Sequence, residues 1–289
     1  MSNKKKSPKH PKHIGVDLGG TNVRAGLVQN GKILALQARP ISSQAKQGII
    51  IDEICETIAA VLQPGVRGIG LGVPSVVDIN TGIVYSAHNI PSWRAVPLKK
   101  ILERRFHLPI FINNDANCFT LGELLFGEAR GYQHVVGLVV GTGLGAGLVI
   151  NGRLYSGNNG GAGEIGAITY KGKYFEYFCS GQFFQRKFGI DAATLQQRAD
   201  GGDREAREMF VAFGDDFAEV IMTLLYAYDP EILVLGGAMI KAHPYFEKRV
   251  REKLRGFHFQ NGLKKLVIAQ TQKSYIAVLG AAALCLDNK

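Results

Sequence analysis

One internal duplication constrains the fold of this chain more than any other feature. Residues 20–34 (GTNVRAGLVQNGKIL) and residues 141–155 (GTGLGAGLVINGRLY) are identical at 8 of 15 positions, at a constant offset of 121. Each copy follows an apolar strand, passes a Gly-Thr turn, continues as a second apolar strand and ends in Asn-Gly, which accepts the positive φ angles of a tight hairpin. Because duplicated units dictate architecture, the sequence predicts two lobes that open with the same β-meander.

The rest of the chain alternates predicted strands and helices, which is typical of an α/β fold. A long helix is expected near residues 204–228 and a last helix over residues 274–286, and helical structure is also expected near residues 176–187. A length of 289 residues is long for a single core and agrees with two lobes. The predicted divisions are a disordered basic tail (1–12), an N-terminal lobe (13–115), a C-terminal lobe (116–272) and a C-terminal helix (273–289) that returns to the N-terminal lobe.

Composition argues against several classes of protein. The most apolar stretch, residues 135–150, is shorter than the roughly 20 residues of a membrane helix, and the Lys-rich N-terminus reads as neither a signal peptide nor an anchor. The four cysteines are scattered without a C-x-x-C pair, which favours a reducing compartment and predicts a cytoplasmic protein. Net charge is +10, but five lysines lie in the first thirteen residues, so we interpret the tail as solvated and expect no nucleic-acid partner.

Three glycine-rich turns are candidates for phosphate binding, because backbone N–H groups can approach phosphate oxygens where side chains are absent. They are Asp17-Leu-Gly-Gly-Thr-Asn22, Gly141-Thr-Gly-Leu-Gly145 and Gly236-Gly237, which follows a predicted strand. Each alone is also explained as a tight turn, whereas the first two, as a related pair, are interpreted as opposite walls of a nucleotide cleft. The predicted nucleotide-binding residues are Asp17, Gly19, Gly20, Thr21, Asn22, Gly141, Thr142, Gly143, Gly236 and Gly237.

Acidic and amide side chains at the ends of predicted elements are candidates for chemistry. Asp115 follows the predicted strand Phe-Ile-Asn-Asn and precedes a helix, so it is either a catalytic acid or part of a helix N-cap. Glu164 lies in the glycine-rich segment 160–166, which needs no carboxylate for folding, and is a ligand candidate. Asn89 and Trp93 belong to a polar segment between elements, where they either line a pocket or pack a loop.

Taken together, these motifs resemble the ROK family of sugar kinases and related repressors, from His13 to the end of the chain. The match is specific because several motifs occur in the same order. They are Gly15-Val-Asp17-Leu-Gly-Gly-Thr21, Gly70-Leu-Gly72-Val-Pro74-Ser-Val-Val-Asp78, Asn113-Asn114-Asp115-Ala-Asn117, Gly141-Thr142-Gly143-Leu-Gly145, Gly163-Glu164-Ile-Gly166 and Leu235-Gly236-Gly237.

The resemblance implies the two-lobed actin-like ATPase (ribonuclease H-like) fold, a hexose substrate and a homodimer. It also implies that ATP lies between the two Gly-Thr turns and Gly236-Gly237, that Asp17 is an outer-sphere partner of Mg²⁺, and that Asp115 is the general base. The residues that the resemblance implies for the sugar are Asn89, Asn114, Asp115, Glu164 and Glu176.

The chain departs from the zinc-containing members that it resembles. Those members follow Gly-Glu-x-Gly with His and then carry a C-x-C-G-x-x-G-C-x-E loop. Here Ala167 stands at the position of that His. In place of the cysteine-containing loop, only the short segment 171–175 comes before Glu176. One cysteine, Cys179, makes no tetrahedral site, so we predict no structural zinc. Packing by Tyr170, Tyr174 or Phe175 is expected to keep Glu176 in place without a metal.

The favoured function is ATP-dependent phosphorylation of the 6-hydroxyl of an aldohexose such as glucose. N-acetylmannosamine, allose and fructose stay open as acceptors. A transcriptional repressor is disfavoured because only about a dozen residues precede the first predicted strand, which we expect to be too few for a helix-turn-helix module. A sugar-binding protein without turnover is a further alternative, which Asp115 and both phosphate turns argue against. An actin-like filament protein shares the architecture but would not need Asn114-Asp115 and Glu164 together.

Overall fold

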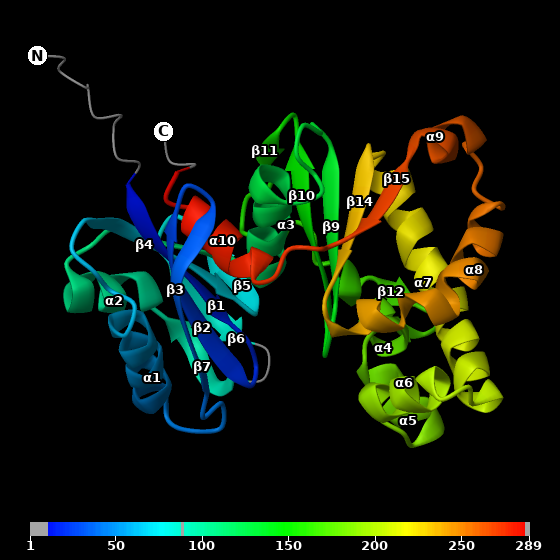
Figure 1. The fold of residues 1–289 in the computed structure, drawn as a ribbon, viewed down its shortest axis with the longest axis horizontal. Helices are drawn as coiled ribbons and strands as arrows, with labels where there is room; N and C mark the ends of the chain where they lie inside the picture. Colours follow the sequence, from blue (N-terminus) through cyan, green and yellow to red (C-terminus); the bar gives the residue numbers. More distant parts are fainter. Residues whose placement is uncertain (1–10, 88–89, 287–289) are drawn as a thin grey trace, which may run out of the picture. The chain divides into compact units, whose positions relative to one another are not determined.

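The computed structural model describes residues 11–87 and 90–286, and its contacts divide the chain into two compact units (Figure 1). Unit 1 comprises residues 1–122, 158–160 and 274–289, and unit 2 comprises residues 123–157 and 161–273. The expected disordered tail lies mostly outside the described residues, and β1 begins at Lys12. No helix in the described part of the chain is long and apolar enough to cross a membrane.

Unit 1 is built on a five-stranded sheet with the order β3-β2-β1-β4-β8. The meander β1-β2-β3 is antiparallel, whereas β4 pairs parallel with both β1 and β8. A smaller antiparallel sheet has the order β5-β6-β7. The strands are β1 (Lys12–Leu18), β2 (Asn22–Gln29), β3 (Lys32–Pro40), β4 (Val66–Val73), β5 (Ser75–Asp78), β6 (Ile83–Ala87), β7 (Ile90–Val96) and β8 (Ile110–Asn114).

Helices cover both faces of the main sheet of unit 1. Successive side chains of a strand point to opposite faces, so the sheet packs against helices on both sides. Ile14 and Val16 of β1 belong to the same core cluster as Ile50 and Ile54 of α1 (Gln47–Ala59), while α2 (Leu98–Phe106) contacts β8. On the other face lies α10 (Ile276–Ala283), so close that a Cβ at Gly70 would be 1.8 Å from the carbonyl oxygen of Ala281. The last helix of the chain therefore completes the core of unit 1.

Unit 2 repeats this plan with a sheet of order β11-β10-β9-β14-β15. Strands β9, β10 and β11 form an antiparallel meander, and β14 pairs parallel with β9 and β15. The strands are β9 (Val135–Val140), β10 (Leu144–Ile150), β11 (Arg153–Leu154), β12 (Thr169–Tyr170), β13 (Lys173–Tyr174), β14 (Ile232–Gly236) and β15 (Val267–Gln270). The helices are α3 (Asp115–Phe126), which begins in unit 1, α4 (Phe175–Cys179), α5 (Gln182–Phe188), α6 (Ala192–Asp200), α7 (Arg204–Tyr228), α8 (His243–Leu254) and α9 (Gln260–Lys265), with 3-10 turns η1 (Ile165–Ala167) and η2 (Ala238–Ala242).

The long helix α7 organises the core of unit 2. Its N-cap Asp203 accepts a hydrogen bond from the Ala206 N–H, which satisfies one of the unpaired donors at the helix start. Phe210, Phe213 and Phe217 follow at helical spacing and are fully buried; Phe213 stacks on Phe217, and Phe210 stacks on Tyr245. Burying such an aromatic side chain contributes about 1.5–3 kcal/mol, so this stripe fixes the face that α7 turns inward.

The predicted duplication is confirmed, and the structure adds a difference between its two copies. Both Asn-Gly turns are two-residue hairpins with positive φ at Asn30 (53°) and Asn151 (53°). The Gly-Thr turns differ: residues 19–22 separate the paired Leu18 and Val23, whereas only residues 141–143 separate Val140 from Leu144. The second copy is one residue shorter at the turn that matters for phosphate binding.

The helical structure expected near residues 176–187 is divided between two helices. The chain forms α4, leaves the helical path at Ser180 (φ −124°, ψ 169°), and resumes as α5 from Gln182. The physical reason is a hydrogen bond from the Gly181 N–H to the Gly141 carbonyl at 2.7 Å, which uses a donor that a continuous helix would need for itself. A contact between distant parts of the chain thus overrides the local helical pattern.

Candidate functional site

In unit 1 the predicted residues gather at the carboxyl ends of three parallel strands. Asp17 of β1 pairs with Gly72 of β4, and Gly72 pairs with Asn113 of β8, so the three positions lie in one row across the sheet. Adjacent strands are about 4.8 Å apart, which places the backbones of Asp17 and Asn113 roughly 10 Å apart. The carboxyl edge of a parallel sheet is where ligands of α/β proteins bind, and the two motifs meet there.

Asp17 lies opposite Arg24 in the β1-β2 hairpin, and the two side chains form an ion pair with a distance of 3.2 Å between Oδ2 and Nη1. The Asp17 side chain is 21% exposed. Burial raises the pKa of Asp17 above its usual value, and the neighbouring Arg24 guanidinium partly offsets this effect. The turn closes through a hydrogen bond from the Gly19 N–H to the Asn22 carbonyl at 2.9 Å. The first turn therefore holds a carboxylate that one cation compensates only in part.

The segment from Asn113 to Asn117 is both a helix cap and a rigid polar cluster. Asn114 Oδ1 accepts from the N–H groups of Ala116 (2.8 Å) and Asn117 (3.3 Å), and so caps α3, while Asn114 Nδ2 donates to the Ser75 carbonyl at 3.4 Å. Asn113 Oδ1 accepts from the buried Asn117 side chain at 2.9 Å. The N-cap alternative thus applies to Asn114, which leaves Asp115 as the first residue of the helix.

Asp115 is held at the positive end of the α3 dipole. Its Oδ1 accepts a hydrogen bond from the Ala116 N–H at 2.8 Å, and the residue is half-buried. The thiol of Cys118, one turn along α3, has its pKa raised by burial and then by the nearby negative charges of Asp115 and Asp17. Asp115 directly follows Asn114, which pairs with Val73, the residue after the Gly72 that pairs with Asp17, so both acids lie at one edge of the sheet.

In unit 2 the second glycine turn is held from outside by the segment that contains α4. Glu176 Oε2 accepts a hydrogen bond from the Leu144 N–H at 2.9 Å, and the Gly181 N–H donates to the Gly141 carbonyl. A Cβ at position 143 would lie 2.6 Å from Glu176 Oε2, so a larger residue there would displace this carboxylate from its place. Because Glu176 occupies the Leu144 N–H, that amide does not point at a free anion site.

The third glycine turn is next to the second. Gly236, the last residue of β14, pairs with Val139 of β9, just before Gly141. Gly237 has φ 91°, and a Cβ there would lie 2.2 Å from the Val140 carbonyl oxygen. Both its backbone conformation and its neighbour therefore require glycine. The predicted pair of nucleotide segments in unit 2 does come together at the ends of two parallel strands.

The loop that carries Glu164 lies along β10. The Ala146 N–H donates to the Gly163 carbonyl at 3.0 Å, and a Cβ at Gly166 would meet the Leu144 carbonyl at 2.3 Å and the Glu176 Cβ at 3.4 Å. Glu164 is exposed at the start of η1. The two glutamates that sequence reasoning assigned to the sugar thus belong to neighbouring segments over the start of β10.

Two of the earlier candidates lie elsewhere. Asn89 falls outside the described residues, so its predicted contact with the sugar stays a prediction. Trp93 is 1% exposed in the core of unit 1, which agrees with the packing alternative rather than with a pocket wall. The remaining candidates form one set in unit 1, Asp17 to Asn22 with Asn114 and Asp115, and a second set in unit 2.

With this geometry established, comparison with known proteins places the chain. Residues 13–288 match the ROK family. This chain belongs to the ROK family. A glucokinase of Thermotoga maritima is 31% identical to it over 96% of this chain and 98% of the relative, and an N-acetyl-D-glucosamine kinase of Pectobacterium carotovorum is 32% identical over 78% and 84%.

A solved structure agrees with this assignment. The ROK family glucokinase of Streptomyces griseus, in complex with glucose and AMPPNP, has a TM-score of 0.83 and 28% identity, covering 94% of this chain and 98% of its own. The predicted fold class is therefore confirmed: the chain has the actin-like ATPase fold of ROK sugar kinases.

Sequence reasoning about this ROK protein missed several residues that shape the site. Arg24 could have been identified from the sequence as the hairpin partner of Asp17, because the register from the Asn-Gly turn places the two opposite each other. Asp216 could have been identified as an acid between Phe213 and Phe217 on the apolar stripe of α7. Gly181 had no local signal, since its role depends on a partner forty residues away.

Metal ligands and cavities add two observations. Among residues 11–87 and 90–286, no three His, Cys, Asp or Glu side chains are grouped to hold a metal ion, and the absence of structural zinc stays a prediction.

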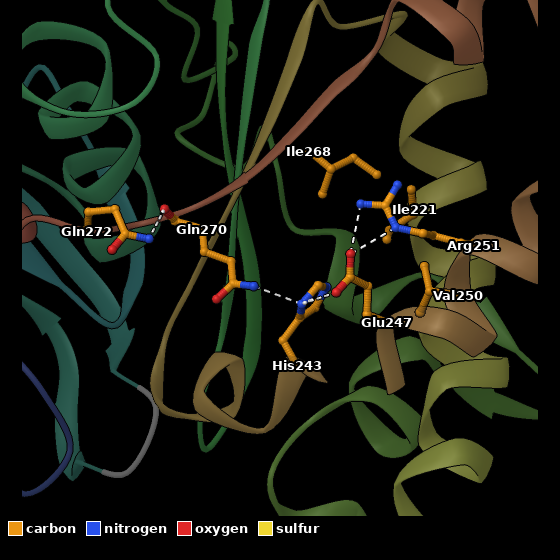
Figure 2. Close-up of a pocket in the computed structure, with 8 residues that line it drawn as sticks. All are labelled: Ile221, His243, Glu247, Val250, Arg251, Ile268, Gln270 and Gln272. Atoms are coloured by element: carbon orange, nitrogen blue, oxygen red, sulfur yellow. Dashed lines mark hydrogen bonds and ion pairs between the residues drawn. The ribbon is translucent and has the colours of Figure 1, made fainter. Parts of the chain in front are cut away.

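A cavity of about 260 Å³ in unit 2 is lined from α7, α8 and β15 (Figure 2). Its polar groups pair with one another: Gln270 Nε2 lies 2.8 Å from His243 Nδ1, and Arg251 contacts Glu247 at 2.8 Å. None of the predicted site residues lines it.

Proposed function

We propose that the protein transfers the γ-phosphoryl group of ATP to a hydroxyl of a hexose, with the 6-hydroxyl of glucose as the first candidate. Membership of the ROK family, together with relatives that include a glucokinase and an N-acetyl-D-glucosamine kinase, supports the class: the protein is an ATP-dependent sugar kinase. The single observation that carries the proposal is Asp115, fixed at the first turn of α3 beside the capping Asn114 and in the row of strand ends that includes Asp17.

Asp115 is the proposed general base. In-line phosphoryl transfer depends on positioning and charge neutralisation, and a carboxylate next to the attacking oxygen accepts the hydroxyl proton as the new bond forms. The Ala116 N–H holds Asp115 Oδ1, which restricts the rotamer of the carboxylate before the sugar arrives. Asn89, Asn114, Glu164 and Glu176 are the proposed hydroxyl ligands of the sugar.

The glycine turns are the proposed nucleotide ligands, with Asp17 as the outer-sphere partner of Mg²⁺. Mg²⁺ usually binds through one or two carboxylates and the phosphates rather than in a cage of protein ligands. Asp17 fits this use, because its carboxylate is mostly buried and Arg24 compensates it only in part. When bound, the cation would neutralise charge on the phosphates; Asp17 and the Gly19 turn would orient them.

The acceptor sugar is the part of the proposal with open alternatives. The relatives include an N-acetyl-D-glucosamine kinase as well as a glucokinase, so an N-acetylhexosamine acceptor stands beside glucose, with N-acetylmannosamine, allose and fructose. A sugar-binding protein with little turnover is the second function class. The four cysteines form no disulfide, which fits the proposed cytoplasmic location, and a homodimer is the proposed assembly.

A coupled ADP-release screen over hexoses and amino sugars tests the function. We expect one sugar to stimulate ADP release strongly over ATP alone, and Asp115→Asn to lower kcat by about 10²–10⁴-fold, the usual contribution of a general base. Sugar affinity, measured by calorimetry, should survive the substitution because shape is kept. ADP release that needs no sugar, or that persists in the Asn variant with an unchanged melting temperature, would contradict the proposal.

A further inference from the structure

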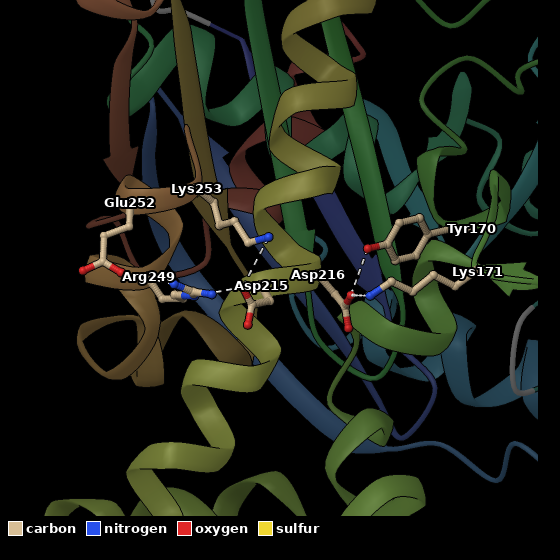
Figure 3. A network of polar contacts seen from close by, with 7 residues as sticks. All are labelled: Tyr170, Lys171, Asp215, Asp216, Arg249, Glu252 and Lys253. Carbon is tan, nitrogen blue, oxygen red and sulfur yellow. Dashed lines mark hydrogen bonds and ion pairs between the residues drawn. The ribbon is translucent and has the colours of Figure 1, made fainter. Parts of the chain in front are cut away.

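The hairpin 169–174, formed by β12 and β13, is attached to α7 through one buried carboxylate. Asp216, 8% exposed at its side chain, accepts hydrogen bonds from Tyr170 Oη at 2.9 Å and from Lys171 Nζ at 2.6 Å (Figure 3). Burial is the main cause that raises the pKa of Tyr170 to about 12, and the hydrogen bond to Asp216 raises the pKa of Lys171. Both groups are therefore donors at physiological pH, and together they satisfy a charge that would be costly alone.

Lys171 adopts a backbone conformation that its side chain does not favour. It has φ 47° and Gly172 has φ 72°, so the two form the centre of a two-residue hairpin turn. Asn-Gly is the usual sequence for such a turn, and lysine is rarely found in the left-handed region. A strained residue persists where its surroundings hold it, and here the ammonium–carboxylate contact with Asp216 supplies that hold.

The same hairpin packs against α4. The Tyr170 ring stacks on Phe175 with centroids 4.7 Å apart and meets Phe178 edge-on at 5.5 Å. Lys171 Nζ lies 5.0 Å from the centroid of the Tyr170 ring, over its face, and so adds a cation–π contact. The Phe175 N–H donates to the Ile168 carbonyl at 3.0 Å, which ties the start of α4 to the start of the hairpin. The hairpin and the start of α4 are therefore joined by ring packing and by a backbone hydrogen bond.

The α4 segment in turn holds both ends of the second glycine turn. Glu176 accepts from the Leu144 N–H at one end, and the Gly181 N–H donates to Gly141 at the other. A continuous set of contacts thus leads from Asp216 on α7, through the hairpin, to the carboxylate of Glu176. All of these residues belong to unit 2, which keeps the set within one body.

We propose that Lys171, acting with Tyr170 and Asp216, is a positioning residue that sets Glu176 over the second glycine turn and so tunes sugar affinity. The part that concerns sugar rests on the proposed function; the part that concerns the turn does not. In this proposal Lys171 acts through Tyr170, Phe175 and α4.

The neighbouring residue on α7 supplies a matched control. Asp215 points to the other side of the helix, where it contacts Arg249 at 2.8 Å and Lys253 at 3.6 Å on α8 (Figure 3). Asp215→Asn removes an ion pair from the same turn of the same helix without touching the hairpin. Asp215 is more exposed than Asp216 (34% against 8%), so the two variants are compared at temperatures equally far below their own melting points. A general loss of stability is then shared by both variants, whereas a loss of positioning belongs to 216.

Hydrogen exchange on the purified full-length chain tests the positioning directly, whatever the enzyme activity. Lys171→Asn should leave the hairpin turn intact, since Asn-Gly suits it, but should release it from Asp216. We expect peptides that cover residues 141–148 and 175–181 to exchange at least fivefold faster in Lys171→Asn and Asp216→Asn than in the wild type or in Asp215→Asn. Lys171→Arg, which keeps the charge, should restore most of the protection. Equal exchange in the 216 and 215 variants would overturn the proposal.

Steady-state kinetics with the best sugar of the ADP-release screen provide the second readout. Displacing a substrate-binding side chain by about 1 Å often lowers catalytic efficiency by an order of magnitude or more. We therefore expect the KM for sugar to rise about tenfold in Lys171→Asn, with kcat changed less than twofold. An unchanged KM for sugar in an active enzyme would overturn the role in sugar affinity. If the wild type uses no sugar, the proposed function fails, and the exchange result still decides whether Lys171 positions the turn.

Discussion

The two copies of the opening meander share a backbone plan but handle their glycine turns in different ways. In unit 1 the turn after β1 brings its own charges, because Asp17 and Arg24 pair across the hairpin. In unit 2 the corresponding pair across β9 and β10 is Val139 and Gly145, and the carboxylate at the turn belongs to Glu176 of α4, 32 residues after Leu144. The two copies therefore share a backbone scaffold. The charged groups at the first turn belong to the hairpin itself, whereas the carboxylate at the second turn comes from a segment that is distant in the sequence.

Asp17→Asn is expected to have the largest effect of any change at the two turns. If the first turn owes its function to its own carboxylate, the substitution should lower kcat by about 10²-fold or more, with a rise in the Mg²⁺ concentration needed for half activity. Mg²⁺ titrations of sugar-dependent ADP release measure this. Val139→Thr, at the matching place in unit 2, should change kcat less than about threefold. Similar losses in both variants would remove the distinction between the turns.

Gly143→Ala and Gly141→Ala separate the two sides of the second turn. A Cβ at 143 meets Glu176 Oε2, so we expect a rise of about tenfold in the KM for sugar and little change for ATP. A Cβ at 141 meets nothing within 4 Å, so this variant should fold as the wild type does. If phosphates approach Gly141, its KM for ATP should rise while the KM for sugar stays the same. The same pattern in both variants would show that the turn acts as one unit.

The smallest expected effect is on stability. Because burial raises the pKa of Asp17 in the folded chain, the wild type binds a proton more tightly when folded and loses stability as pH rises through that raised pKa. Asp17→Asn carries no such charge, so its melting temperature relative to the wild type should increase from pH 4 to pH 8 without nucleotide. The matching difference for Val139→Thr should stay constant with pH. A difference for Asp17→Asn that falls with pH would mean that Arg24 outweighs burial.

Local sequence predicted the parts of the molecule that local physics determines. The Asn-Gly hairpins follow from the φ angles that those residues accept, and α7 follows from its apolar spacing. The gathering of Asp17 and Asp115 at one sheet edge follows from parallel strands that end beside each other. The roles of these two residues in phosphoryl transfer remain predictions.

Long-range contacts account for what could not be predicted. The break between α4 and α5 depends on Gly181 finding the Gly141 carbonyl, and the attachment of the hairpin depends on Lys171 reaching Asp216 on another helix. The sequence pointed to Tyr170 and Phe175 as packing residues near Glu176, and they do stack on each other, but it offered no sign of the buried charge behind them.

The seating of α10 against Gly70 has a consequence for how the protein is made. Unit 1 begins with the first strands to leave the ribosome, yet one face of its sheet, where Cys118 of α3 lies over Gly72, is incompletely covered until α10 has been translated. Unit 2, whose segments are contiguous apart from three residues, can assemble before that moment. The sheet of unit 1 is therefore translated first but receives α10 only at the end of synthesis. During this interval its exposed apolar surface is most accessible to chaperones and most prone to aggregation.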